Sequence, residues 1–196
     1  MDIKGIAKRV FEIEAKSIAH LSTQLTDDFT HAVKRIAEGG GRVVVCGMGK
    51  SGHIGKKIAA TLASTGTPSF FVHPAEAFHG DLGMLTSEDV FLSISNSGET
   101  DELLKLTPFI KEHKITHICM VGNPTSTLAL HADYVLNVHV EEEACPLQLA
   151  PTSSTTATLA MGDAIAVALI EVKEFKAENF ASFHPGGSLG RKLLTK

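Results

Sequence analysis

The pattern of apolar and polar residues along this chain predicts a regular succession of helices and strands. Near the start, apolar residues recur every three or four positions, which is typical of helices with one buried face and predicts helices over residues 2–24 and 27–38. Further on, short apolar runs predict strands. We expect these strands at residues 43–46, 69–73, 90–95, 117–121 and 134–140. We expect the remaining helices at residues 51–64, 74–78, 99–113, 126–131 and 152–172.

The first four predicted strands are mainly apolar, whereas most of the helices between them are amphipathic. A strand that helices cover on both faces is apolar along its whole length. Strands that alternate with helices then indicate the α/β class, here a doubly wound, five-stranded parallel sheet of flavodoxin-like type. Such sheets bind their ligands at the carboxyl ends of the strands. We expect a single domain over residues 1–196.

Composition narrows the class of protein. With 43% hydrophobic and 20% charged residues, the chain has the composition of a soluble globular protein. Its formal net charge of −4 gives no electrostatic reason to expect nucleic acid as a partner. Cys46, Cys119 and Cys145 are odd in number and widely spaced, so we expect neither a disulfide framework nor a metal site.

Nothing in the hydropathy pattern suggests export or a membrane. The first residues lack the basic segment and apolar core of a signal peptide. The longest apolar stretch, residues 157–170, is interrupted by Gly162-Asp163, and we expect it to be too short to cross a bilayer. We therefore expect a cytoplasmic protein with no membrane partner.

Two loops with glycine and hydroxyl residues carry the most chemical information. Residues 47–52 read GMGKSG and residues 95–100 read SNSGET, and each loop follows a predicted strand. The free backbone N–H groups at the start of a helix favour an anion at such a place. Two of these loops side by side can bind one phosphate group from two directions, so the sequence predicts a phosphorylated small molecule as ligand.

Other interpretations of the first loop remain open. Residues 47–52 also satisfy the GxGxxG pattern of dinucleotide-binding proteins, but Glu76 comes slightly late to hold a ribose. The Gly-Lys-Ser triplet at residues 49–51 invites comparison with a nucleotide P-loop, which would need glycine where Val44 stands. A purely structural turn is the simplest alternative, although it explains neither the lysine nor the second loop.

Several segments together resemble the sugar-isomerase (SIS) domain, and within it the arabinose-5-phosphate isomerases. The similarity covers roughly residues 1–195. The segments that carry it are GMGKSG at 47–52, HPAEAFHGDLGM at 73–84, SISNSGET at 93–100, EACP at 143–146, APTSSTT at 150–156 and FHPGGSLGR at 183–191.

The resemblance implies an aldose–ketose isomerase that interconverts D-ribulose 5-phosphate and D-arabinose 5-phosphate through an enediol, without a cofactor. Its product would be the precursor of 3-deoxy-D-manno-octulosonate for lipopolysaccharide or capsule. The resemblance also implies a homo-oligomer, a tetramer, with active sites shared between subunits. An isomerase of another phosphosugar and a non-catalytic sugar-phosphate-sensing module are the alternatives.

The resemblance also implies roles for particular residues. Glu143 would be the enediol base with Glu102 as a second carboxylate, Lys50 would stabilise negative charge, and His79 would assist ring opening or proton relay. His184 would reach the site of a neighbouring subunit. We expect burial to raise the pKa of Glu143 toward that of a general base. The implied phosphate-binding residues are Ser51, Ser95, Asn96, Ser97 and Thr100, and the further substrate contacts are Gly49, Thr152, Ser153 and Ser154.

The chain departs from the family pattern in two places. Members of the family often continue into a pair of regulatory CBS domains, and none is present within these 196 residues. In addition, Gln148 stands where the family pattern has glycine, which bears on the shape of the loop that contains Glu143.

Overall fold

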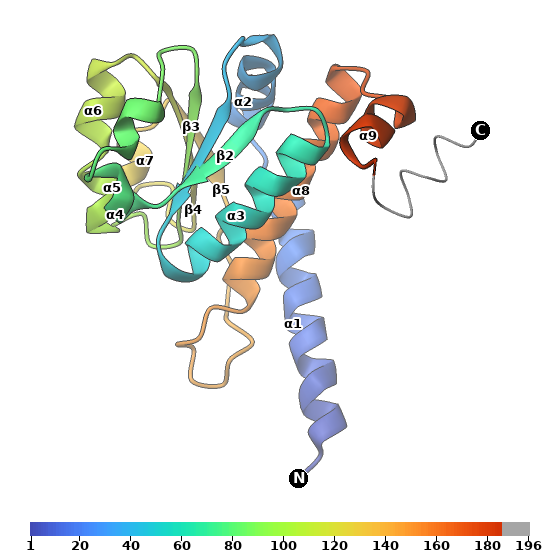
Figure 1. Cartoon of the computed structure of the whole chain (residues 1–196). Coiled ribbons are helices and arrows are strands. Elements are labelled where there is room, and N and C mark those ends of the chain that lie inside the picture. Colours follow the sequence, from blue (N-terminus) through green and yellow to red (C-terminus); the bar gives the residue numbers. More distant parts are fainter. Residues whose placement is uncertain (186–196) are drawn as a thin grey trace.

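A computed structural model describes residues 1–185 of the chain, and it is built around one five-stranded sheet (Figure 1). All strand pairs are parallel, and the strand order is β2-β1-β3-β4-β5. This confirms the predicted doubly wound, five-stranded parallel sheet. The strands are β1 (Val43–Gly47), β2 (Ser69–Val72), β3 (Val90–Ser95), β4 (Thr116–Val121) and β5 (Tyr134–Asn137).

Helices cover both faces of the sheet, and alternate strand residues face the two layers. Val43 and Val45 pack with one group of helices, whereas Val44 and Cys46 pack with the other. The first group is α1 (Ile3–Gln24), α2 (Asp27–Glu38), α3 (Gly49–Ser64) and α8 (Ser153–Val172). The second group is α4 (Pro74–Ala77), α5 (Asp101–Leu104), α6 (Thr107–Glu112) and α7 (Thr127–Leu130). The remaining helices within residues 1–185 are η1 (Asp81–Met84) and α9 (Ala177–Phe183).

Two predicted elements differ from the structure by more than two residues, whereas the bounds of the others agree to within two. The helix predicted over residues 99–113 is two short helices, α5 and α6, with Pro108 in the first turn of α6. Proline has no N–H group to continue a helical hydrogen-bond series, so the chain turns before it. The strand predicted over residues 134–140 ends at Asn137, whose side chain accepts a hydrogen bond from the backbone N–H of His139 at 3.0 Å.

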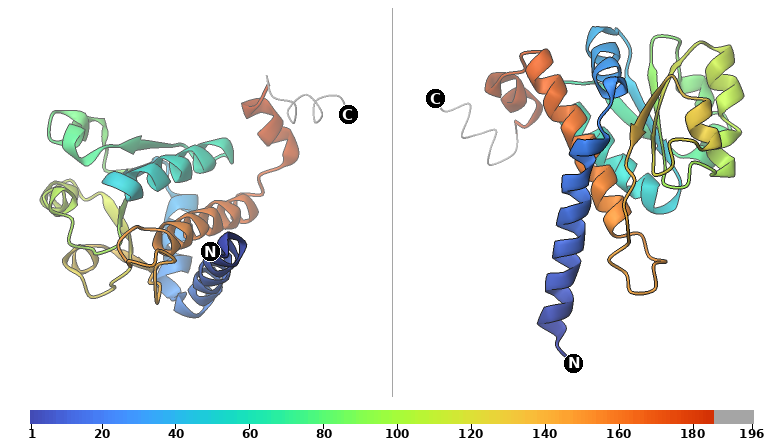
Figure 2. Two further views of the ribbon diagram at one scale, coloured as in Figure 1. Left: turned by 90° about the horizontal axis from the view of Figure 1, so that it is seen from below. Right: turned by 180° about the vertical axis from the view of Figure 1, so that it is seen from behind.

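The expectation that the apolar stretch at residues 157–170 is too short to cross a bilayer was wrong, because this stretch belongs to the longer helix α8. Its 20 residues, with a mean hydropathy of 1.5 over an 18-residue window, make it long and apolar enough to span a membrane by length and composition. It packs instead against α1, α2 and α3, and both views in Figure 2 show α1 lying beside it. Ile165 and Ala157 are fully buried there. A helix that is apolar on most sides suits such a central position.

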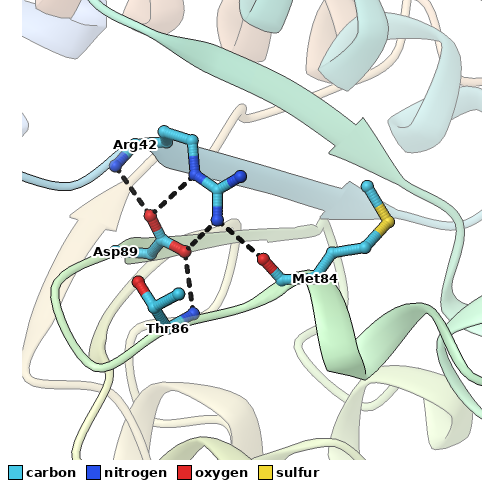
Figure 3. Close-up of polar contacts among 4 residues, drawn as sticks. All are labelled: Arg42, Met84, Thr86 and Asp89. Carbon is cyan, nitrogen blue, oxygen red and sulfur yellow. Dashed lines mark hydrogen bonds and ion pairs between the residues drawn. The ribbon is translucent and has the colours of Figure 1, made fainter.

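An ion pair joins the starts of β1 and β3 (Figure 3). Asp89 is 1% exposed, and its carboxylate accepts hydrogen bonds from the Arg42 guanidinium at 2.7 and 3.1 Å. The backbone N–H groups of Arg42 and Thr86 donate to the same carboxylate at 2.8 and 2.9 Å. Burial alone would raise the pKa of Asp89, but these bonds outweigh burial and lower the pKa to about 2. Arg42 also donates to the carbonyl oxygen of Met84 at 2.6 Å.

A buried histidine joins β4 to β3. His117 Nε2 lies 2.8 Å from the hydroxyl of Ser93, and His117 Nδ1 lies 3.3 Å from the carbonyl oxygen of His131. The carbonyl is only an acceptor, so Nδ1 carries the proton of the neutral ring and Nε2 accepts from Ser93. Burial of the ring lowers the pKa of His117 to about 4.

We therefore expect the folded chain to lose stability as the pH falls from 6.5 to 4. In this window the unfolded state binds a proton on His117 that the folded state does not, so the free energy of unfolding decreases by about 3 kcal/mol. The replacement His117→Gln keeps a partner for Ser93 and removes the titrating ring. Urea unfolding of both proteins at several pH values tests this, and parallel losses in the two proteins would contradict it.

Candidate active site

The carboxyl edge of the sheet holds a hollow of about 210 Å³ between the first loop, the second loop and the start of α8. Lys50 and Ser51 come from the first turn of α3, Asn96 follows β3, and Ser154 lies in the first turn of α8. The hollow is lined by Met48, Lys50, Ser51, Ile54, Asn96, Pro151, Ser154, Thr155 and Thr158. The structure thus brings together four of the predicted site residues.

The first loop reaches this place because β1 and β3 are neighbours in the sheet. Their register pairs Gly47 with Ile94, so the two loops leave the sheet side by side. At the start of α3, a side chain on Gly52 would collide with the carbonyl oxygen of Gly47. Glycine therefore lets the helix begin directly against the strand end. Gly52 therefore has a structural role in this turn. This role does not account for Lys50 and Ser51, which also lie at the hollow.

The hydroxyl groups of the second loop converge on one another. The Ser95 hydroxyl lies 2.8 Å from that of Thr100 and 3.5 Å from that of Ser97, and it accepts a hydrogen bond from the backbone N–H of Gly98 at 3.0 Å. Gly98 has a φ of +68°, and a side chain there would collide with the hydroxyl of Ser126. The hydroxyls of Ser95, Ser97 and Thr100, three of the five predicted phosphate-binding residues, therefore lie together at the end of β3.

Ser154 adds an unsatisfied group to the hollow. The residue is 2% exposed, and its hydroxyl makes no well-aligned hydrogen bond within residues 1–185, although it lies close enough to the Glu143 carboxylate to lower the pKa of that group. Buried hydroxyl groups are nearly always hydrogen-bonded in folded proteins. A bound ligand with polar atoms would satisfy the Ser154 hydroxyl.

Glu143 lies beside this hollow, with its carboxylate at the start of α8. The carboxylate accepts hydrogen bonds from the backbone N–H of Thr152 at 2.7 Å, from the Thr152 hydroxyl at 3.0 Å and from the backbone N–H of Ser154 at 3.3 Å. The hydroxyls of Thr152 and Ser153 in turn accept from the backbone N–H of Ala144 at 2.9 and 3.2 Å. A carboxylate at the N-terminus of a 20-residue helix also interacts favourably with the helix dipole.

The expected direction of the Glu143 pKa was wrong. Partial burial does raise the pKa, but the donors of Ser154 and Thr152 outweigh it, so the pKa of Glu143 lies below its ordinary value. Free N–H groups at a helix N-terminus stabilise the ionised form of a carboxyl group. Glu143 is therefore an ionised carboxylate near neutral pH.

The other predicted site residues do not line the hollow, and Ser95, Ser97 and Thr100 of the second loop are among them. His79 is exposed in the turn after α4, and Glu102 lies in the first turn of α5 on the other face of the sheet. Gly49 faces a separate small hollow lined also by His53 and Lys56. The roles predicted for His79, Glu102 and Gly49 stay predictions.

His184 lies at the wrong end of α8 to join the site of its own chain. The helix starts at the site and has 20 residues, which corresponds to about 30 Å. In Figure 1, α9 lies at the far end of α8 from the loop that precedes α8. The His184 ring stacks on Phe180, and its Nδ1 lies 2.9 Å from the carbonyl oxygen of Phe180.

Sequence reasoning missed several residues of the site. Met48, Ile54 and Pro151 supply the apolar part of the hollow, and Thr155 and Thr158 add hydroxyl groups from the next turns of α8. The three-to-four spacing of residues 151, 154, 155 and 158 places them on one face of a helix and was a usable signal.

Glu99 was not predicted to have a role. Its carboxylate accepts a hydrogen bond from the backbone N–H of Thr127 at 2.8 Å and so ties the second loop to the start of α7. This bond lowers the pKa of Glu99. Among residues 1–185, no group of three or more histidine, cysteine and acidic side chains is arranged to hold a metal ion.

Hydroxyl-rich loops at the carboxyl edge of a parallel α/β sheet are typical of proteins that bind small anionic ligands. The SIS domain family matches residues 36–168, and the chain belongs to this family. Arabinose 5-phosphate isomerase KdsD of Yersinia pestis is 57% identical over 196 residues, which are 100% of this chain and 60% of that protein. The enzyme of the same name from Pseudomonas aeruginosa is 58% identical, with the same coverage.

A solved structure is also similar to this chain. The structure of c3406 from Escherichia coli CFT073, in complex with arabinose 5-phosphate, is similar with a TM-score of 0.90 and 42% sequence identity. The match covers 94% of this chain and 98% of that one. By contrast, the chain spans about 60% of the length of the two curated relatives.

Proposed function

We propose that this protein is an aldose–ketose isomerase that interconverts D-ribulose 5-phosphate and D-arabinose 5-phosphate. The main support is that Lys50, Ser51 and Asn96 meet at one hollow, with the ionised carboxylate of Glu143 next to it. The names of the two curated relatives and the sugar-phosphate complex of the solved relative agree with this substrate. The arabinose 5-phosphate, formed in the cytoplasm, would be the precursor of 3-deoxy-D-manno-octulosonate.

The proposed reaction moves one proton between the carbon atoms C1 and C2 of the sugar. The Glu143 carboxylate removes the proton from one carbon to give an enediolate, a hydroxyl proton passes between the two sugar oxygens O1 and O2, and the protonated Glu143 returns its proton to the other carbon. The Lys50 ammonium group stabilises the negative charge that develops on the sugar oxygens. The loop from Ser95 to Thr100, together with Ser51, binds the phosphate group and sets the distance from the phosphate to the reacting carbons.

Turnover in deuterated water tests this proposal. The purified chain is incubated with D-arabinose 5-phosphate and EDTA, and the sugar is followed by NMR. We expect ribulose 5-phosphate to appear with deuterium at the carbon that exchanges a proton. If the protein turned over a different phosphosugar in preference, that sugar would replace D-arabinose 5-phosphate as the proposed substrate. Binding without turnover or exchange would favour the sugar-phosphate-sensing module.

We further propose that the chain forms a homo-oligomer with shared active sites, and the resemblance indicates a tetramer. The first half of α1 extends away from the rest of the molecule in Figure 1, where Ile3 is 73% exposed and Phe11 is 69% exposed. A short helix without packing partners is only marginally stable in water. A second copy of this chain that covers these residues would also bring a His184 from outside.

Mixing of two inactive variants tests the shared site. We expect His184→Ala and Glu143→Gln each to be nearly inactive alone, because each lacks one half of every site. Mixed oligomers contain some sites in which both residues are intact, so up to about a quarter of the wild-type activity should return if sites are paired between two chains at random. Subunit exchange is verified by native mass spectrometry, and no recovery after exchange would show that each site comes from one chain.

A further inference from the structure

Gln148 has an unusual backbone conformation in the loop between β5 and α8. Its φ is +55°, in the left-handed region that glycine adopts readily and that most side chains avoid. This explains why glycine is suited to this position. A glutamine that adopts the same conformation needs compensating contacts in the folded state.

The carboxamide of Gln148 makes such contacts with the main chain of Glu143. Its Oε1 accepts a hydrogen bond from the backbone N–H of Glu143 at 2.8 Å, and its Nε2 donates to the carbonyl oxygen of Glu143 at 2.7 Å. The same Nε2 donates to the carbonyl oxygen of Cys145 at 3.1 Å. One side chain thus binds both the N–H and the C=O of the residue that carries the proposed base, as a neighbouring strand would.

We propose that Gln148 is a positioning residue that holds Glu143 in its catalytic orientation. This inference rests on the proposed isomerase activity and on Glu143 as its base. The α8 N-terminus fixes the Glu143 carboxylate through Thr152 and Ser154, and Gln148 fixes the main chain at the other end of the side chain. A general base must lie within hydrogen-bond reach of the proton it removes, and small displacements slow the reaction strongly.

Two variants separate this role from a purely conformational one. Gln148→Gly and Gln148→Ala both remove the carboxamide, but only glycine adopts the left-handed conformation readily. We expect kcat to fall about fivefold to tenfold in both variants, because each loses the two exposed hydrogen bonds to Glu143. We expect KM to change by less than about twofold, because the proposed phosphate-binding loop follows β3, whereas Gln148 lies in the loop between β5 and α8.

A second readout does not depend on turnover. The backbone N–H of Glu143 donates to Gln148, so its hydrogen exchange measured by NMR should become faster in both variants by at least about threefold. If the wild-type chain showed no isomerase activity, the proposed function would fail while the exchange measurement would still report on the Gln148 contact. Wild-type exchange at Glu143 in both variants would overturn the inference.

Lys114 provides a matched control. Its φ is also +55°, and it precedes β4 at the opposite edge of the sheet from the site. Lys114→Gly relieves the same backbone conformation, and we expect it to leave kcat and the exchange of Glu143 unchanged. If Gln148→Gly retained wild-type kcat while only Gln148→Ala were impaired, the backbone conformation alone would matter and the positioning role would be overturned.

Discussion

Glu143→Gln is expected to lower kcat by about two to four orders of magnitude, which is the range that a general base contributes. Glutamine has nearly the same shape as glutamate, and its amide oxygen can still accept the hydrogen bond that the backbone N–H of Thr152 donates. The variant therefore keeps the loop and the start of α8 while it loses the group that accepts the proton. Steady-state kinetics with D-arabinose 5-phosphate measures the loss.

The neighbouring residue supplies the control for this experiment. Glu142 precedes Glu143 in the sequence and is exposed, and we expect Glu142→Gln to retain wild-type kcat. Calorimetric titration with the sugar phosphate should show that Glu143→Gln binds within about threefold of wild type, because phosphate binding depends on another loop. Wild-type kcat in Glu143→Gln would remove this carboxylate from the mechanism and would return attention to Glu102.

Asp89→Asn is expected to lower the free energy of unfolding by about 3 kcal/mol. The buried carboxylate accepts four hydrogen bonds, and those with a charged partner contribute more than neutral ones. An asparagine presents an NH2 group where one carboxylate oxygen stood, and because Arg42 donates to both oxygens, a donor of Arg42 faces this group in either orientation. The loss stays well below that of a stranded buried charge, because the Arg42 side chain is 40% exposed and can be hydrated.

Urea unfolding near pH 7 measures this difference, and Glu88→Gln is the matched control. Glu88 is exposed beside Asp89, and we expect its replacement to change the free energy of unfolding by less than about 0.5 kcal/mol. The contribution of Asp89 is present above its unfolded-state pKa and is lost as the pH falls from about 4 toward 2. The window of His117 lies at higher pH. Equal stability of Asp89→Asn and wild type would contradict the importance of the pair.

The sequence predicted the central part of the site because its signals are local. Glycines and hydroxyl residues directly after apolar runs marked the loops at residues 47–52 and 95–100. Strands β1 and β3 are parallel neighbours, so loops at their carboxyl ends necessarily meet. Pro108 also carried a local signal for the end of a helix, although the apolar spacing around it favoured one continuous element.

The features that sequence reasoning missed depend on contacts between distant elements. The direction of the Glu143 pKa depends on α8, whose first N–H groups meet the carboxylate only in the folded chain. The distance of His184 from the site depends on the course of α8 across the molecule (Figure 2). The Gln148 contacts with Glu143 arise from a loop shape that the sequence indicated only through the glycine expected at this position.

The contact between Glu143 and the start of α8 also has a consequence for the timing of the proposed reaction. When the carboxylate takes a proton from the sugar, α8 loses the negative charge at its N-terminus, and the donors of Thr152 and Ser154 lose part of their acceptor. The protonated enzyme is therefore a high-energy state of the central helix as well as of the active site. Return of the proton to either carbon of the sugar restores the charged start of α8, so the helix disfavours release of the intermediate while Glu143 still holds the proton.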